Sequence, residues 1–529
     1  MKLDDLTLLR CAKQHIDNAF PSHIFGQKNA NICRNSVVEC LGSALTYFED
    51  ESLAPHSLFR YQALCERKKT KNSLKTLWQQ LNNCAIFLLR WHDRRDNVAR
   101  RVDHYVRVED TSELSKYFFK VTDFEKILYG TDVWYRDHFA HVLRVWMVGV
   151  YVIYECKNRI RPPDIHPAIN VASFETSELF SAFTIAALCH DLGYPIEKTS
   201  KINDKISEMF GTFGGLDWSR LNYNFTPQRH ELGKLLVEYL SGAAHFNDDR
   251  GNDEPLESAA LKGALENMVS EYAEPTARTV KELSEIQESA LRTRVRIGIR
   301  SQHTYSRKYS DSLESVDHGI LSAMILMRKV RYFKEGEFDN VPRNFLFEEL
   351  RQFLLRREIL RACASHTCRD VYYIHPLTIE SLLFFCDELQ EWGRPRFSDL
   401  KDMAPESLGA LQVDLEEYSE RRICWTIDAG SLDDEAGLKW CRGLARKFRN
   451  ALAGPVNVMD SNGATFELCW KMCWRAEAGG AGDCTVTFRA GGVGNANGSE
   501  PYTFNFVDAG GKEKSLLDNL EAESLGFLS

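Results

Sequence analysis

One segment sets narrow limits on the fold, because an apolar, small-residue stretch leads directly into two adjacent polar residues. The segment Thr184–Pro195 has the sequence TIAALCHDLGYP, in which His190 and Asp191 precede the helix-ending Gly193 and Pro195. A helix of this composition is expected to be buried on more than one side. His190 and Asp191 should therefore lie at the edge of a core. An ionised carboxylate is costly there unless it has a partner, and a metal ion is a natural one.

The overall composition limits the class of protein. The chain has 529 residues, of which 44% are hydrophobic and 27% charged, as in a globular protein of two or three domains. The net charge of −9 argues against a nucleic-acid-binding role, because a nucleic-acid coat protein needs a basic surface. The 15 cysteines include no paired CxxC pattern of the zinc-ribbon type, so we expect reduced core residues.

The N-terminal residues and the length of the apolar runs indicate where in the cell the protein is expected. The first residues lack the apolar run and cleavage site of a signal peptide. The longest apolar stretch, about Val145 to Tyr154, is too short to span a bilayer. We therefore expect a cytoplasmic protein without a membrane segment.

Helical periodicity dominates the chain up to about residue 402. Residues 126–402 predict one helical domain, and residues 1–125 predict a helical region that is either separate or part of that domain. The polar stretch Ala243–Pro255 predicts a loop. Helices are expected over Ser73–Trp91, His138–Tyr154, Ser177–His190, Pro227–Leu240, Thr279–Ile299, Asp317–Val330, Asn344–Ser365 and Leu377–Trp392.

The pattern changes to short strands in residues 403–529, which predict a separate α+β domain. One helix is expected over Asp434–Leu452, and the glycine clusters that follow are interpreted as turns. Strands are expected over Arg422–Ile427, Thr465–Cys469, Cys484–Phe488 and Tyr502–Val507. The predicted fold class is thus mainly α, with a smaller C-terminal α+β domain.

Further polar residues interrupt apolar helix faces. His138 and His141 are three residues apart and share one face of a predicted helix. A lone histidine in such a place is more often a hydrogen-bonded core residue than a metal ligand. The second polar helix end, at His190 and Asp191, favours the metal-ligand interpretation here. Asp387 follows a strongly apolar run, where a carboxylate needs a cation or an ion pair, for example with Arg394.

The order of these residues resembles the HD superfamily of metal-dependent phosphohydrolases. The segment beginning at His141 (HVLRV) is similar to the first motif of the family, AALCHDLGYP to the second and LLFFCDELQ to the last. The resemblance covers about residues 130–395 and implies an HD-type helical domain. It also implies that the metal ligands are His141, His190, Asp191 and Asp387.

The resemblance implies further site residues. His318 and His366 are similar to extra histidines in family members that have two metals or a catalytic histidine, and His230 is an alternative for the first role. Glu197 or His318 is a candidate general acid or base. Substrate-binding candidates are Lys198, Arg136, Tyr194, His138 and His230, and additional phosphate-binding charge is expected from Arg361 or the run Arg292–Arg300.

The expected activity is hydrolysis of a nucleotide, with nucleoside or deoxynucleoside triphosphates as the first substrate class. The expected cofactor is one or two divalent transition metal ions (Mn, Fe, Co, Ni or Zn), with or without Mg, because imidazole and carboxylate ligands suit these ions. The alternatives are a nucleotide or cyclic-dinucleotide phosphodiesterase or phosphomonoesterase, and a catalytically silent nucleotide-sensing scaffold. The resemblance also implies a homo-oligomer, and the C-terminal domain is expected to regulate, oligomerise or bind a partner protein.

Overall fold

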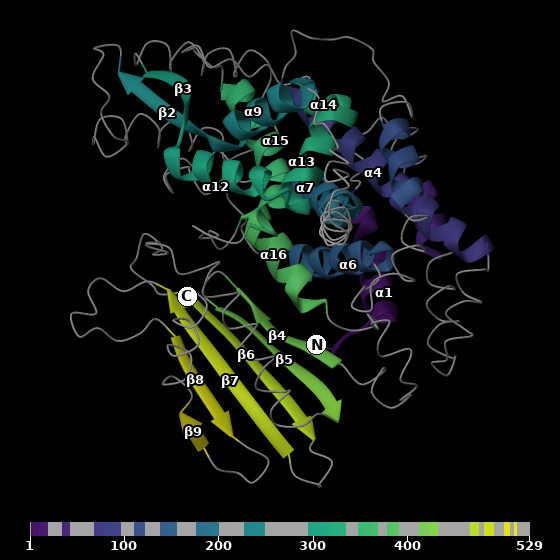
Figure 1. The fold of residues 1–529 in the computed structure, drawn as a ribbon. Coiled ribbons are helices and arrows are strands. Elements are labelled where there is room, and N and C mark those ends of the chain that lie inside the picture. The colour runs from purple at the N-terminus through teal and green to yellow at the C-terminus, as the bar shows by residue number, and fades with distance from the viewer. Residues whose placement is uncertain are drawn as a thin grey trace, which may run out of the picture.

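The computed structural model describes a helical body and a C-terminal sheet (Figure 1). The described residues are 2–19, 34–42, 68–96, 111–121, 138–155, 176–199, 227–248, 295–334, 347–368, 378–390, 412–419, 422–431, 466–475, 481–490, 502–507 and 513–515. The helices are α1 (Asp5–Ala19), α4 (Lys68–Asp96), α6 (Phe139–Glu155), α7 (Thr176–Cys189), α9 (Pro227–Ser241), α12 (His303–Glu314), α13 (His318–Lys329), α14 (Arg331–Lys334), α15 (Phe347–Ser365) and α16 (Ile379–Leu389). Residues 34–42, 111–121 and 194–199 are also helical.

Helix α7 lies at the centre of the helical body, in contact with α4, α6 and α15. Every residue of α7 after Thr176 is buried, as its composition predicts. A close approach to α6 is possible because Gly149 lacks a side chain: a Cβ there would lie 2.0 Å from the Phe183 ring. Each fully buried Leu, Ile or Phe contributes about 1.5–3 kcal/mol, so this packing fixes the position of the C-terminal end of α7.

Polar side chains from neighbouring helices hold the same end of α7. The Trp78 indole of α4 donates a hydrogen bond to the Leu188 carbonyl oxygen at 2.8 Å. The Tyr117 hydroxyl donates to the Leu192 carbonyl oxygen at 2.9 Å. Carbonyls at a helix C-terminus lack intrahelical partners, so these donors stabilise the end of the helix where His190 follows.

A seven-stranded sheet packs below the helices, with strand order β1-β4-β5-β6-β7-β8-β9 (Figure 1). All pairs are antiparallel except β5–β6, which is parallel. A parallel pair needs a crossover connection, and the predicted helix Asp434–Leu452 falls in this connection, outside the described residues. The strands are β1 (Lys2–Leu3), β4 (Gln412–Tyr418), β5 (Arg422–Ser431), β6 (Phe466–Arg475), β7 (Ala481–Ala490), β8 (Tyr502–Val507) and β9 (Glu513–Ser515).

One face of the sheet belongs to the same hydrophobic core as the helices. Ile423, Trp425 and Ile427 alternate along β5 and are buried, as expected for a strand with one covered face. The Tyr418 ring lies 6.4 Å from the Phe385 ring of α16 in an edge-to-face arrangement. The chain start joins the sheet too, because β1 pairs with β4.

Two predictions of local structure were wrong over the part of each segment that the structure describes, residues 243–248 and 295–299. The expected loop Ala243–Pro255 begins in strand β2 (Gly242–Asp248), and the expected helix Thr279–Ile299 ends in strand β3 (Val295–Ser301). These strands form an antiparallel pair in which Gly242 faces Ser301. The physical reason is tertiary pairing: each strand supplies the hydrogen-bond partners that the other would lack alone.

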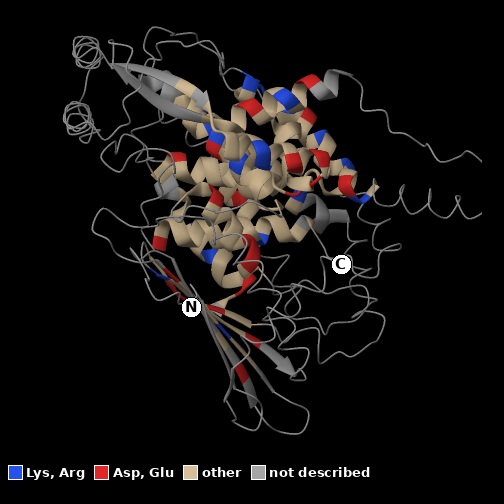
Figure 2. Cartoon of the chain, turned by 60° about the vertical axis from the view of Figure 1, so that its left-hand side comes forward, with Lys and Arg blue, Asp and Glu red and all other residues tan. Residues whose placement is uncertain are grey.

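The coarse fold prediction is confirmed: the described chain is mainly α, with a sheet near its C-terminus. Each helix predicted between residues 138 and 392 is present in the described residues, except that the described end of Thr279–Ile299, from Val295 on, is a strand. Among the described residues, one helical stretch, Thr176–Thr199, is long and apolar enough to cross a membrane, but 83% of its most apolar window is buried inside the protein. Lys and Arg residues are interspersed with Asp and Glu along the described elements (Figure 2).

Candidate metal centre

The turn after α7 presents His190 and Asp191 to the interior. Helix α7 ends at Cys189, and the Leu192 amide donates to the Cys189 carbonyl oxygen at 3.3 Å. The Tyr194 amide then donates to the Asp191 carbonyl oxygen at 3.0 Å. His190 is fully buried and Asp191 is 8% exposed, so both polar side chains depend on protein partners.

Three other helices and one helix end bring further ligand types to this turn. His141 lies in the first turn of α6, and His318 is the first residue of α13. His366 directly follows α15, and Asp387 lies in the last turn of α16. Residues far apart in the sequence therefore meet in one cluster, which we call the His/Asp cluster: His141, His190, Asp191, His318, His366 and Asp387.

Asp191 lies between two pairs of histidines. Its Oδ2 atom lies 3.4 Å from His190 Nε2 and 3.8 Å from His141 Nε2. Its Oδ1 atom lies 3.3 Å from His318 Nε2 and 3.5 Å from His366 Nε2. The two carboxylate oxygens thus face opposite sides of the cluster.

Asp387 completes the side that contains His141 and His190. Its Oδ1 atom lies 2.8 Å from His141 Nε2 and 3.9 Å from His190 Nε2. Two groups have ligand atoms that all lie within 4.8 Å of one another: His141 with His190 and Asp387, and His190 with Asp191 and His366. His190 belongs to both groups.

The Nδ1 atoms of His141 and His190 are held by oxygen acceptors. His141 Nδ1 lies 2.5 Å from Oε1 of the buried Gln390. His190 Nδ1 lies 2.8 Å from the Ala187 carbonyl oxygen. Because a carbonyl oxygen accepts only, Nδ1 must donate, which leaves the Nε2 lone pair directed into the cluster.

The other two histidines follow the same pattern. His366 Nδ1 donates to the Cys363 carbonyl oxygen at 2.7 Å. His318 Nδ1 lies 2.5 Å from Glu197 Oε2, and the His318 backbone amide donates to the same oxygen at 3.0 Å. Outer partners of this kind fix the tautomer and ring orientation of metal-binding histidines.

The residues fit a divalent transition metal. Nε2 of His190 and Nε2 of His366 are buried and make no hydrogen bond to any described residue. A buried acceptor without a partner costs roughly 1–3 kcal/mol, and metal coordination would remove that cost. Imidazole and carboxylate donors suit Mn, Fe, Co, Ni or Zn.

The electrostatics of the cluster keep His190 neutral and Asp191 ionised. Burial lowers the pKa of His190, against the opposing effect of Asp191. For Asp191, burial favours the neutral form, but the attraction of the neighbouring His190, His318 and His366 rings outweighs it, so the pKa of Asp191 is well below its usual range. Burial opposes charge on His318, yet hydrogen bonds to Asp191 and Glu197 raise its pKa to about 9.

The turn sits against α13 because Gly193 has no side chain. A Cβ at Gly193 would lie 2.2 Å from the His318 carbonyl oxygen. The Gly193 amide donates to Ser322 Oγ at 2.7 Å, and Ser322 Oγ donates to the His318 carbonyl oxygen at 2.8 Å. Val316, just before α13, adopts φ of 57°, which is strained for a β-branched residue.

The predicted substrate-binding residues that are described lie beside the cluster. The Tyr194 ring lies 3.8 Å from the His138 ring and 5.4 Å from the His318 ring. Lys198 Nζ lies 5.2 Å from the centre of the Tyr194 ring. Arg136 lies outside the described residues, and His230 lies on α9 with a side chain outside them.

Of the other basic candidates, Arg361 is the one whose side chain is described, and it contacts the end of α9. Arg361 is fully buried, and its Nε donates to the Leu240 carbonyl oxygen at 2.7 Å. Its guanidinium therefore stabilises the end of α9. Arg296 and Arg300 lie on β3, and Arg292 and Arg294 fall outside the described residues.

Sequence reasoning missed Gln390 as a partner of His141, and it did not foresee that Glu197 contacts His318. Glu197 was predicted as an acid or base, and the structure places it as the partner of both His318 nitrogen donors. Gln390 follows Asp387 by three residues and is the C-cap residue of α16, and this i,i+3 spacing was the available signal.

Comparison with known proteins adds no relative. The chain matches no protein-family model, no curated protein sequence and no solved structure.

Proposed function

We propose that this chain is a metal-dependent phosphohydrolase of the HD type that acts on nucleotides. The observation that carries the proposal is the common orientation of the four histidines. Each has Nδ1 held by an oxygen acceptor, and each directs Nε2 toward Asp191 or Asp387. A hydrogen-bonded core cluster without a metal has no need of this shared arrangement.

A bound divalent metal would supply an activated water near neutral pH and polarise a phosphoryl oxygen. The chain's own residues would hold the metal ion and supply positive charge for the substrate. His141, His190, Asp191 and Asp387 would hold the ion, and Lys198 beside Tyr194 would attract phosphate oxygens.

His318 has a distinct position, because it bridges two carboxylates. Nδ1 contacts Glu197 and Nε2 faces Asp191 at 3.3 Å. We assign His318 and His366 to a second metal position or to proton transfer, with Glu197 as the positioning residue for His318.

Nucleoside and deoxynucleoside triphosphates are the first substrates proposed, because AALCHDLGYP is similar to the second motif of HD phosphohydrolases. A specific observation favours a second candidate, a phosphodiesterase or phosphomonoesterase with two metals. Asp191 directs one oxygen to each side of the cluster, as a carboxylate that bridges two ions would. Two metals can clamp both the attacking and the leaving oxygen.

The third proposal is a silent nucleotide-binding scaffold. Under it the C-terminal sheet would bind a partner protein or a second copy of the chain, and the protein would act in the cytoplasm as an oligomer. It predicts that Asp191→Ala leaves cellular function intact, whereas the enzyme proposal predicts loss of function.

Product analysis tests these alternatives. The purified protein would be incubated with Mn²⁺ and a panel of deoxynucleoside triphosphates, nucleoside triphosphates, monophosphates and cyclic dinucleotides. Tripolyphosphate identifies a triphosphohydrolase, inorganic phosphate a phosphomonoesterase, and linear dinucleotides a phosphodiesterase. Turnover must vanish in Asp191→Ala and persist in Asp414→Ala, a carboxylate on β4 opposite Lys2. No turnover on any substrate, despite bound metal, would favour the scaffold.

A further inference from the structure

A second group of metal-ligand types lies where α1 meets α6, separate from the His/Asp cluster. Cys11 and His15 are four residues apart on α1, so they share one helix face. Glu155 is the last residue of α6. One ligand atom from each of the three side chains lies within 4.8 Å of the others.

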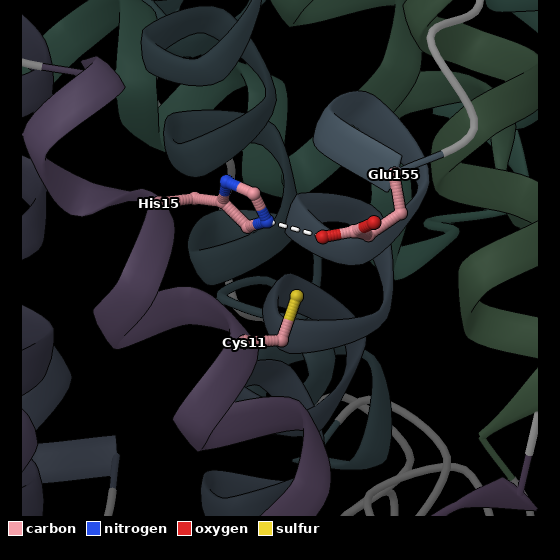
Figure 3. A group of neighbouring side chains, drawn as sticks. All are labelled: Cys11, His15 and Glu155. Atoms are coloured by element: carbon pink, nitrogen blue, oxygen red, sulfur yellow. Dashed lines mark hydrogen bonds and ion pairs between the residues drawn. The ribbon is translucent and has the colours of Figure 1, made fainter.

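The three side chains converge on one point (Figure 3). His15 Nε2 and Glu155 Oε1 form a short contact, and the Cys11 side chain rises from the neighbouring turn of α1 toward them. The His15 ring stacks on Tyr154, with ring centres 4.9 Å apart and an angle of 1° between planes. This stacking fixes the orientation of the imidazole before any ligand arrives.

The donor set is that of a zinc site rather than of a simple ion pair. Thiolate sulfur, imidazole nitrogen and carboxylate oxygen bind Zn²⁺ at about 2.3, 2.0–2.1 and 2.0–2.2 Å. In a tetrahedral site these bonds place neighbouring donors roughly 3.4–3.6 Å apart. Donor atoms within 4.8 Å of one another can reach that spacing by small side-chain rotations.

Solvent can complete the coordination. The His15 side chain is 14% exposed and the Glu155 side chain 44% exposed, so the group opens to water on one side. A three-ligand site with a water in the fourth position is a common arrangement for zinc.

The position of the group gives it a structural consequence. At the other end of the α1–α6 contact, Arg144 donates two hydrogen bonds to Asp5, at 2.9 and 2.8 Å. A metal at the Cys11 end would fasten α1 to α6 at both ends. Helix α1 continues from β1, the edge strand of the sheet, and α6 carries His141.

We propose that Cys11, His15 and Glu155 bind a Zn²⁺ ion that fastens α1 to α6, independently of the His/Asp cluster. The thiolate gives this site a signature that a site of histidines and aspartates lacks.

Cobalt substitution in the full-length protein tests the proposal. Co²⁺ bound by a thiolate absorbs in the near ultraviolet through charge transfer from sulfur. The wild-type protein should show this absorption, and Cys11→Ser and His15→Phe should lose it. His15→Phe keeps an aromatic ring to stack on Tyr154, so it decides the question if Cys11→Ser does not fold. Cys473→Ser, a half-buried cysteine on β6, is the matched control and should keep it.

A second readout uses zinc itself. Added Zn²⁺ should raise the Tm of the wild type and of Cys473→Ser by the same amount, and raise that of Cys11→Ser less. The proposal is overturned if wild-type protein shows no thiolate–cobalt absorption, or if the absorption is unchanged in Cys11→Ser or equally reduced in Cys473→Ser. None of these outcomes depends on phosphohydrolase turnover.

Discussion

Replacing Gly193 by alanine is expected to push the turn after α7 away from the start of α13. A Cβ at this position would lie 2.2 Å from the His318 carbonyl oxygen and 2.6 Å from Leu321 Cβ. Ordinary contact begins at 3.4 Å, so the overlap with the carbonyl oxygen is about 1.2 Å. Neither obstacle is the flexible end of a side chain, so the two segments must separate.

The cost can be estimated from two effects. Overpacking of this kind typically costs about 1–3 kcal/mol. Separation also weakens the hydrogen bond from the Gly193 amide to Ser322 Oγ, which contributes about 1 kcal/mol. We therefore expect the free energy of unfolding to fall by about 2–4 kcal/mol. Because a displacement of about 1 Å near reacting groups can cost roughly 100-fold in rate, turnover should fall by a similar factor through the shift of His318.

Urea denaturation and the nucleotide assay measure the two effects separately. The matched control is Gly42→Ala, because a Cβ at Gly42 would meet no atom of the described residues within 4 Å. That variant should stay within about 0.5 kcal/mol of the wild type and keep its turnover. The reasoning is refuted if Gly193→Ala has the same urea midpoint and turnover as Gly42→Ala.

Two further variants test partners inside the helical body. Gln390→Ala removes the acceptor that orients His141, so metal affinity should fall about 10–100-fold, whereas Gln390→Glu keeps an acceptor and should keep the affinity. Competition with a chromophoric chelator measures the metal affinity of each variant. Equal affinities of Gln390→Ala and the wild type would contradict the assignment. Glu380→Gln leaves the buried Lys308 without its carboxylate, 3.2 Å away, and should cost about 3–5 kcal/mol in the free energy of unfolding. Burial already lowers the pKa of Lys308, against the effect of Glu380, so the folded variant binds this proton more weakly than the unfolded chain does. The stability of Glu380→Gln should therefore recover as the pH rises toward about 10.5, and a cost that does not change with pH in urea denaturation would argue against this reasoning.

The central part of the site was accessible from the sequence because its signals are local. An apolar helix that ends at His190 and Asp191 needs only neighbouring residues to be recognised. Burial of α7 then follows from its composition, and the structure places both residues in the core. Asp387 was accessible for the same reason, since a carboxylate after an apolar run is unusual.

Other parts depend on contacts between distant segments. Lys2 pairs with Asp414, and no local pattern predicts a two-residue strand at the chain start. Strand β3 did have a local signal, because Val295, Ile297 and Ile299 alternate with other residues. The prediction of a helix over this segment missed that period of two.

Two features were predictable from the sequence only in part: the hydrogen-bond partners of the histidines, and the group of Cys11, His15 and Glu155. The i,i+4 spacing of Cys11 and His15 is present in the sequence, but Glu155 lies on another helix and only the fold brings it near. Likewise, Glu197 follows Asp191 closely, yet its hydrogen bonds to His318 depend on the position of α13.

Metal content is the most direct test of the central claim. Three proteins that all carry Cys11→Ser, to remove the proposed zinc site, would be compared: the parent Cys11→Ser variant, the same protein with Asp191→Asn, and the same protein with the control change Asp414→Asn. Each would be loaded with Mn²⁺, Fe²⁺, Co²⁺, Ni²⁺ or Zn²⁺ in turn, desalted and analysed for bound metal. The account predicts bound transition metal in the parent and in the Asp414→Asn protein and a marked loss in the Asp191→Asn protein. Absence of bound metal in every parent sample, or equal metal content in the Asp191→Asn protein, would contradict it.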